Sequence, residues 1–83
     1  MSALVERGGV QSWLPPLLAR PLGVSPEDLD PRRDLADYGM DSVHAVRLAC
    51  ELSRRLGRRV EPTVFWEHPS VQELASHLEE LAR

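Results

Sequence analysis

Gly39, Met40, Asp41 and Ser42 are the residues of this 83-residue chain whose types and spacing best suit chemistry. They stand where an aspartate-rich loop gives way to a segment with strong helical periodicity. This order places the Ser42 hydroxyl at the mouth of a helix, within reach of an enzyme. A helix N-terminus favours a negative group, so a phosphodiester attached to Ser42 would lie at the favourable end of the helix dipole. The pattern is compatible with a serine that another protein modifies.

Ser42 also has a purely structural interpretation. Serine is one of the residues preferred at helix N-caps, and its type and spacing alone favour capping over modification. Asp41 is an equally good cap, or alternatively a contact for the modifying enzyme. No base lies at a convincing spacing from Ser42, so activation of the hydroxyl would have to come from another protein.

Two stretches of the chain, in the right order, resemble one protein family. The run Leu35–Val43 (LADYGMDSV) resembles the attachment-site motif of acyl carrier protein domains, most closely those of polyketide synthases. The run Pro62–Ser70 (PTVFWEHPS) resembles the segment that links the third and last helices of that family. The resemblance covers about residues 10–81. It implies an all-α fold in which Ser42 carries a 4'-phosphopantetheine arm.

The resemblance also implies roles for the neighbours of Ser42 and for partner proteins. Gly39 would allow the close approach of a transferase, and Asp41 would supply local negative charge. The domain would be no enzyme but the substrate of a phosphopantetheinyl transferase. It would present acyl intermediates, held as thioesters, to a ketosynthase, an acyltransferase and tailoring domains through weak and brief contacts. The residues expected to dock these partners are Met40, Val43, Arg47, Cys50 and Trp66.

Other classes of function remain open at this point. Asp41 before the serine favours an acyl carrier over the peptidyl carrier of a nonribosomal peptide synthetase, in which histidine is often found at this position. An unmodified interaction module would use the apolar stripe of Val43, Val46 and Cys50 to bind a partner helix, unless the rest of the bundle covers the stripe. The net charge of −3 argues against a nucleic-acid ligand, although arginines cluster at positions 54, 55, 58 and 59.

A catalytic use of Ser42 finds little support. A hydrolase triad also needs a preorganised oxyanion site and a positioned acid, and the strand-turn-helix pattern of such nucleophiles is missing from the sequence. His44 is expected to be a solvated helix residue, His68 to hydrogen-bond in a turn, and His77 to be exposed. Three scattered histidines predict no metal site.

The helices that must position Ser42 follow from periodicity and capping residues. The first is expected over about residues 12–20, with Ser12 as its N-cap and Pro21 as a stop. With that start, Pro15 and Pro16 fall among the first four positions, whose N–H groups have no partner within the helix. The two prolines would then remove no hydrogen bond, and we expect a short or kinked helix.

A long connector between Val24 and Asp41 then leads to Ser42. The run Ser25–Asp28 predicts a single helical turn, and Leu29 and Leu35 should pin the connector to the core. Connectors of this length are unusual in small domains and are often functional.

The clearest helix is predicted from Ser42 to Leu56, where Gly57 ends it. A brief helix with Pro62 near its start follows, and the last helix opens at Ser70 with a capping-box sequence. The predicted fold class is therefore a small all-α bundle of three main helices and one short helix.

Length and composition bound the core. Eighty-three residues leave room for one domain, expected over residues 10–83 after a flexible tail at 1–9, and monomeric in isolation. Aromatic residues make up only 5% of the chain, so the core must rest mainly on Leu, Val and Ala. Trp13 is expected in the core, together with one member of the pair Phe65 and Trp66.

Cys50 is the only cysteine, which permits no internal disulfide and favours a reducing compartment. The sequence shows no pattern of a signal peptide or a spanning helix. We therefore expect a cytoplasmic protein without a membrane partner.

Overall fold

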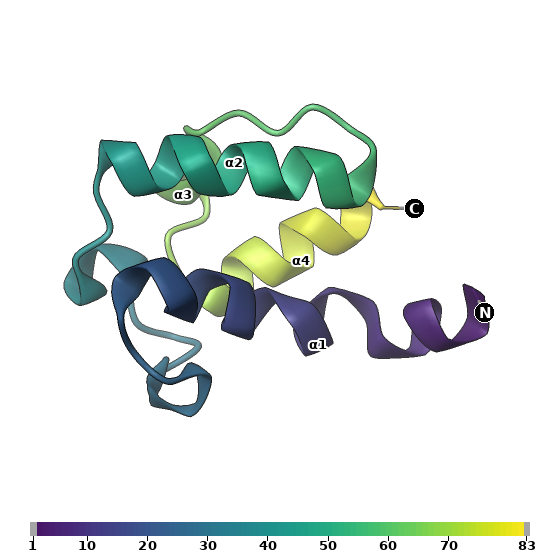
Figure 1. The fold of residues 1–83 in the computed structure, drawn as a ribbon, viewed down its shortest axis with the longest axis horizontal. Coiled ribbons are helices and arrows are strands. Elements are labelled where there is room, and N and C mark those ends of the chain that lie inside the picture. The colour runs from purple at the N-terminus through teal and green to yellow at the C-terminus, as the bar shows by residue number, and fades with distance from the viewer. Residues whose placement is uncertain (1, 83) are drawn as a thin grey trace.

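The computed structural model describes the backbone of residues 2–82 and the side chains of residues 9–82, and the chain forms a small helical bundle (Figure 1). Helix α1 runs in the direction opposite to α2 and α4, and the short α3 lies behind α2 in this view. In the described residues the only β-type pairing is an isolated bridge between Asp34 and Ser70. The predicted bundle of three main helices and one short helix is confirmed. The elements are α1 (Ser2–Leu22), η1 (Pro26–Asp28), η2 (Leu35–Tyr38), α2 (Ser42–Leu56), α3 (Val64–Glu67) and α4 (Val71–Leu81), of which η1 and η2 are 3₁₀ turns.

The first helix differs from the prediction at its start. It begins at Ser2 rather than near Ser12, and Gly9 interrupts it with non-helical backbone angles of φ 58° and ψ −170°. Ser12 is not an N-cap, because its hydroxyl donates to the carbonyl oxygen of Gly9 at 3.2 Å. The expected kink therefore lies at Gly9, ahead of the prolines. The flexible tail at residues 1–9 stays a prediction, and Met1 lies outside the described residues.

The prolines of α1 also behave differently from the prediction. Helical backbone resumes at Val10, which places Pro15 and Pro16 beyond the first four positions. Each proline therefore removes a backbone N–H that would otherwise bond to a carbonyl four residues earlier. Pro21 does not end the helix, which continues to Leu22. Packing maintains the helix, since side chains on either side of the prolines are fully buried, among them Leu14 and Leu18.

Helix α2 has the predicted bounds. Ala45, Leu48, Ala49 and Leu52 form its buried face, and Gly57 ends it in the left-handed conformation with φ 65°. The second apolar stripe is not covered by the bundle: Val43 and Val46 are 63% and 54% exposed.

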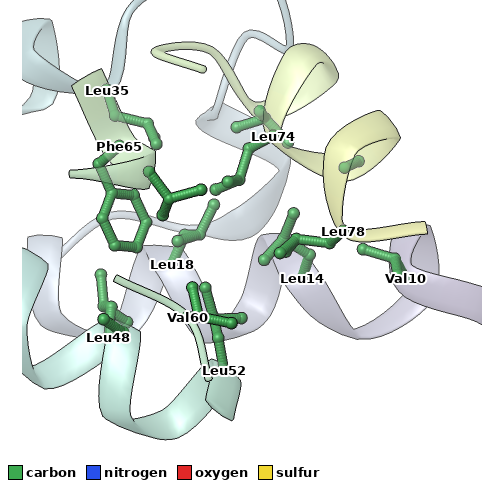
Figure 2. Close-up of a cluster of buried hydrophobic side chains, with 14 of the residues drawn as sticks. Val10, Leu14, Leu18, Leu35, Leu48, Leu52, Val60, Phe65, Leu74 and Leu78 are labelled. Carbon is green, nitrogen blue, oxygen red and sulfur yellow. The ribbon is translucent and has the colours of Figure 1, made fainter. Parts of the chain in front are cut away.

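The core takes side chains from α1, α2, α3 and α4 and from the connector (Figure 2). Leu29 and Leu35 are buried as predicted, so the connector is pinned to the core. Trp13 lies at the edge of this core, where the Arg55 guanidinium stacks 4.9 Å from its ring centroid. The fully buried large side chains are Leu14, Leu18, Leu35, Leu52, Leu74 and Leu78.

The last two helices follow the prediction with one shift. Helix α3 begins at Val64, because Pro62 lies in the turn before it. Ser70 caps α4 as predicted: its hydroxyl oxygen accepts the Glu73 backbone N–H at 3.2 Å. The same hydroxyl donates to the Glu73 carboxylate, also at 3.2 Å.

The two C-terminal histidines occupy unexpected positions. The ring of His68 stacks on that of His77, with centroids 4.1 Å apart and an angle of 15° between the planes. Both residues are half-buried, so the predicted exposure of His77 is wrong. Ring stacking between α4 and the turn before it accounts for the position of both.

Candidate functional site

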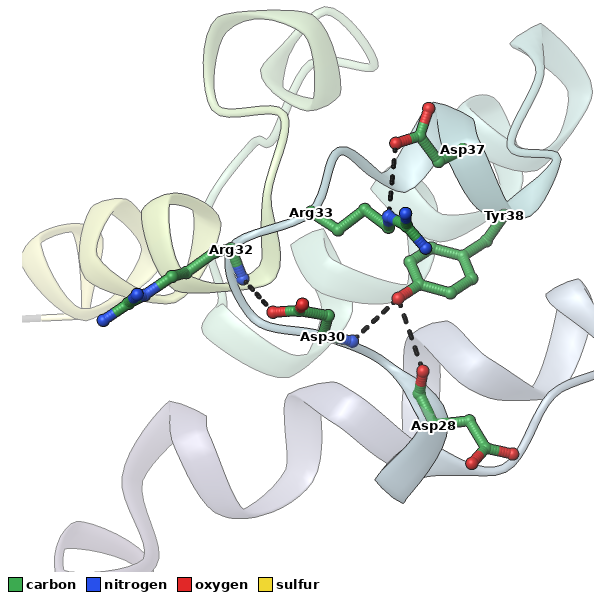
Figure 3. Close-up of polar contacts among 6 residues, drawn as sticks. All are labelled: Asp28, Asp30, Arg32, Arg33, Asp37 and Tyr38. Carbon is green, nitrogen blue, oxygen red and sulfur yellow. Dashed lines mark hydrogen bonds and ion pairs between the residues drawn. The ribbon is translucent and has the colours of Figure 1, made fainter.

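The connector that leads to Ser42 is braced by its own polar groups (Figure 3). The Tyr38 hydroxyl accepts the Asp30 backbone N–H at 2.8 Å and donates to the Asp28 carbonyl oxygen at 3.3 Å. The Asp30 carboxylate accepts the Arg32 backbone N–H at 3.0 Å. Tyr38 therefore ties the end of η2 back to η1, across ten residues of chain.

The connector is also tied to the segment before α4. The Leu35 backbone N–H donates to the Pro69 carbonyl oxygen at 2.7 Å, and the Gln72 N–H donates to the Pro31 carbonyl oxygen at 2.9 Å. These bonds hold the two motifs that resemble carrier proteins beside each other, although they lie about 30 residues apart in the sequence.

Gly39 turns the chain from η2 toward α2. It adopts the left-handed conformation with φ 93°, which L-residues with a side chain rarely adopt. A β-carbon at this position would meet no atom within 4 Å. Within the fold, backbone conformation rather than lack of space explains a glycine here.

Ser42 is the first residue of α2 and is exposed, but it is not the cap. The N-cap is Asp41, whose Oδ1 accepts the His44 backbone N–H at 3.0 Å. Among residues 9–82 the structure records no hydrogen bond of the Ser42 hydroxyl. Asp41 thus takes the structural role that was open to both residues, and leaves the serine free at the positive end of the helix dipole.

Asp41 is held as a carboxylate by the same bond. The backbone N–H of His44 stabilises its charged form, so the pKa of Asp41 lies below the ordinary value of an aspartate. The Asp41 backbone N–H in turn donates to Nδ1 of His44 at 3.3 Å.

His44 is the site residue that sequence reasoning missed. Its side chain is only 28% exposed and closes a reciprocal capping box with Asp41, so it is not merely a solvated helix residue. The signal was present in the spacing: a residue with an acceptor side chain three positions after an N-cap can bond back to the N-cap backbone N–H.

The predicted docking residues fall into two groups around Ser42. Val43, Arg47 and Cys50 are exposed on α2 at steps of four and three residues, which places them on one face. Met40 and Trp66 together line a hollow of about 240 Å³ between η2 and α3. Phe65 is buried while Trp66 is 58% exposed, as expected for this pair.

Over residues 9–82, whose side chains the structure describes, no three side chains come together in a group suited to hold a metal ion. No described helix combines the length and apolar character that a membrane crossing requires.

Comparison with known proteins identifies the family. Residues 12–78 match the family described as "Phosphopantetheine attachment site". The chain belongs to this family. Its members carry 4'-phosphopantetheine covalently on a serine, so the resemblance seen in the sequence is confirmed.

Sequence relatives place this carrier domain near those of polyketide synthases. It is 45% identical over 69 residues to one of the subunits of the phenolphthiocerol/phthiocerol polyketide synthase of Mycobacterium tuberculosis, and the match covers 83% of this chain and 4% of that relative. It is 43% identical over 58 residues to 6-methylsalicylic acid synthase of Penicillium patulum, covering 70% of this chain and 3% of the synthase. The chain therefore spans only a few per cent of the length of these relatives.

Solved structures support the carrier fold. A free-standing peptidyl carrier protein from Acinetobacter baumannii matches with a TM-score of 0.83 and 28% identity, over 90% of this chain and 98% of that one. The HMG-ACPI domain of the CurA module from Lyngbya majuscula matches with a TM-score of 0.78 and 19% identity, over 88% and 75%. The second likeness concerns the fold alone.

Proposed function

We propose that this carrier domain holds acyl intermediates of a polyketide synthase on a phosphopantetheine arm attached to Ser42. The observation that carries the proposal is the exposed Ser42 hydroxyl at the first position of α2, free because Asp41 supplies the cap. The relatives at 45% and 43% identity favour the polyketide class.

The residues present fit a covalently attached phosphodiester. Ser42 lies at the N-terminus of α2, where free backbone N–H groups and the helix dipole favour a negative charge. In loading, the Ser42 oxygen forms a bond to the phosphorus of the pantetheine phosphate of coenzyme A, and adenosine bisphosphate leaves. The hydroxyl proton passes to a base of the transferase, because the side chains of residues 9–82 do not assemble around Ser42 the triad that a self-activated serine needs. His68 and His77 stack on each other, and Nδ1 of His44 faces Asp41.

The arm would supply a terminal thiol on which acyl groups are carried as thioesters. A flexible tether raises the effective concentration of the carried group at each partner's active site without any new contact. By this proposal the partners are a phosphopantetheinyl transferase, a ketosynthase, an acyltransferase and tailoring domains. The α2 face of Val43, Arg47 and Cys50, and the hollow of Met40 and Trp66, are the surfaces that would dock them.

A peptidyl carrier is the second candidate. The likeness to the Acinetobacter baumannii peptidyl carrier protein at a TM-score of 0.83 favours it, whereas Asp41 before the serine and the polyketide synthase relatives favour the acyl class. Once the arm is loaded, an acyltransferase that delivers malonyl groups and an adenylation domain that delivers amino acids would separate the two classes.

The test of attachment is the intact mass of the protein after incubation with coenzyme A, magnesium and a broad-specificity phosphopantetheinyl transferase. We expect one added phosphopantetheinyl group on the parent and none on Ser42→Ala. Ser76→Ala is the matched control, since Ser76 is an exposed serine on α4 and its loss should leave loading intact. A folded parent that gains no mass would favour an unmodified interaction module that uses the exposed Val43 and Val46.

A further inference from the structure

The capping box beside Ser42 contains a group that changes its hydrogen-bonding character with pH. Oδ1 of Asp41 accepts the His44 backbone N–H at 3.0 Å, and Nδ1 of His44 accepts the Asp41 backbone N–H at 3.3 Å. In the usual capping box the residue at N3, three positions after the N-cap, is Glu or Gln, whose acceptor oxygen is present at every physiological pH. A histidine nitrogen accepts only when it carries no proton.

Nδ1 of His44 faces two competing partners. It lies 3.3 Å from the Asp41 backbone nitrogen and 3.1 Å from the Asp41 Oδ1. The neutral imidazole with its proton on Nε2 can accept the backbone N–H. The imidazolium cannot accept, but it can donate to the carboxylate and form a charged pair. In one position the ring can therefore either accept the Asp41 backbone N–H or donate to the Asp41 carboxylate, and uptake of a proton replaces the first bond by the second.

Asp41 is the charged group that takes part in this exchange with the His44 ring. Among residues 9–82, the only ion pair recorded for His44 is with the Asp41 carboxylate. Asp37, the next acid back along the chain from Asp41, pairs with Arg33 at 3.6 Å. The positive group closest along the helix is Arg47, one turn further and exposed.

We propose that His44 is a positioning residue for the loading of Ser42. Its neutral ring fixes the turn Met40–Asp41–Ser42 through the Asp41 backbone N–H, and protonation releases that N–H and draws the Asp41 carboxylate into an ion pair. Ser42 is the next residue, so the released bond lies directly before the attacking oxygen. Loading then weakens as His44 gains a proton. This inference rests on the proposed attachment at Ser42.

The tautomer provides a readout that does not depend on loading. Nitrogen chemical shifts of the His44 ring, measured on the parent across the pH series, report its protonation, and in the neutral ring they should show the proton on Nε2 and a bare Nδ1. A neutral ring protonated on Nδ1 would contradict the proposal, because the Asp41 N–H would then have no acceptor there.

The loading test compares the parent with His44→Gln and His44→Ala. Glutamine keeps an acceptor at every pH, so His44→Gln should load like the parent where the parent's His44 ring is neutral, and about two- to tenfold faster where that ring is protonated, the range of one ordinary hydrogen bond. His44→Ala should load about two- to tenfold more slowly than the parent where the parent's ring is neutral. Taking the ratio of variant to parent at each pH removes the transferase's own pH profile, and circular dichroism confirms that each variant is folded.

The outcomes separate this inference from the function on which it rests. Equal loading of parent, His44→Gln and His44→Ala at every pH would overturn the role of His44 while leaving attachment at Ser42 in place. A parent that is folded but never loaded would overturn the proposed function, and the loading role of His44 with it. A ratio of His44→Gln to parent that rises as the parent's ring gains its proton, with the Nε2 tautomer in the neutral ring, supports the proposal.

Discussion

At the scale of single residues, the neighbours Asp41 and Ser42 have different roles in the site. Asp41 caps α2 and Ser42 keeps a free, exposed hydroxyl. The sequence predicted both residues for the site but left the capping role open between them, because Ser and Asp are almost equally good caps. The backbone conformation shows which of the two is the N-cap: Asp41 is extended with φ −131°, whereas Ser42 already belongs to the helix.

The bond at Asp41 makes stability depend on pH in a definite direction. Its pKa is lowered in the fold because the carboxylate accepts the His44 backbone N–H. The stabilisation is present above the unfolded-state pKa of about 4 and is lost as the pH falls through the lower folded-state pKa. Urea midpoints measured between about pH 6 and pH 2 should therefore fall further for the parent than for Asp41→Asn, which caps but does not titrate. Parallel pH curves for the two proteins would show that the charge has no role.

At the scale of elements, the ends of a helix could be predicted where signals in the local sequence determine them. Helix α2 has its predicted bounds since an apolar period, an N-cap and Gly57 all agree. Helix α1 was mispredicted because the proline argument depends on where the helix begins, and Gly9 sets that start. The turn η2 was missed altogether. Its place is fixed by the burial of Leu35 and the bond to Pro69, which are tertiary contacts.

The corrected start of α1 gives Pro16→Ala a definite expected effect. Pro16 is exposed and lies past the first four helical positions after Gly9. Alanine restores a backbone N–H within reach of the Ser12 carbonyl. The free energy gained from this hydrogen bond exceeds the cost of the greater conformational entropy of the unfolded chain. The free energy of unfolding should therefore rise by about 1–2 kcal/mol. Pro26→Ala is the control, because Pro26 begins η1, where no N–H partner is missing. Chemical denaturation measures both. A destabilised Pro16→Ala would favour a helix that begins at Ser12.

At the scale of the whole molecule, the core and the proposed docking face of α2 use different side chains. The core takes leucines from α1, α2 and α4, together with Leu35 of the connector. The proposed docking face of Val43, Arg47 and Cys50 contributes nothing to that core. This separation suits a carrier, which must present one surface to several partners while its fold stays constant. It also predicts that substitutions in the two regions have different consequences.

The contrast between Leu74→Ala and Val46→Ala tests this separation. Leu74 is fully buried, so its truncation leaves a cavity and should lower the free energy of unfolding by about 2–5 kcal/mol, a large fraction for a domain of this size. Val46 is 54% exposed on the uncovered stripe, and its truncation should change stability by less than about 0.5 kcal/mol. Urea denaturation gives both values.

The same variants separate loading from folding. Loading of Ser42 should slow in Leu74→Ala only in proportion to the fraction of protein that is unfolded, because Ser42 is exposed and lies outside the core. If Val46→Ala instead destabilised the fold as strongly as Leu74→Ala, the stripe would belong to the core and could not serve as a free docking face.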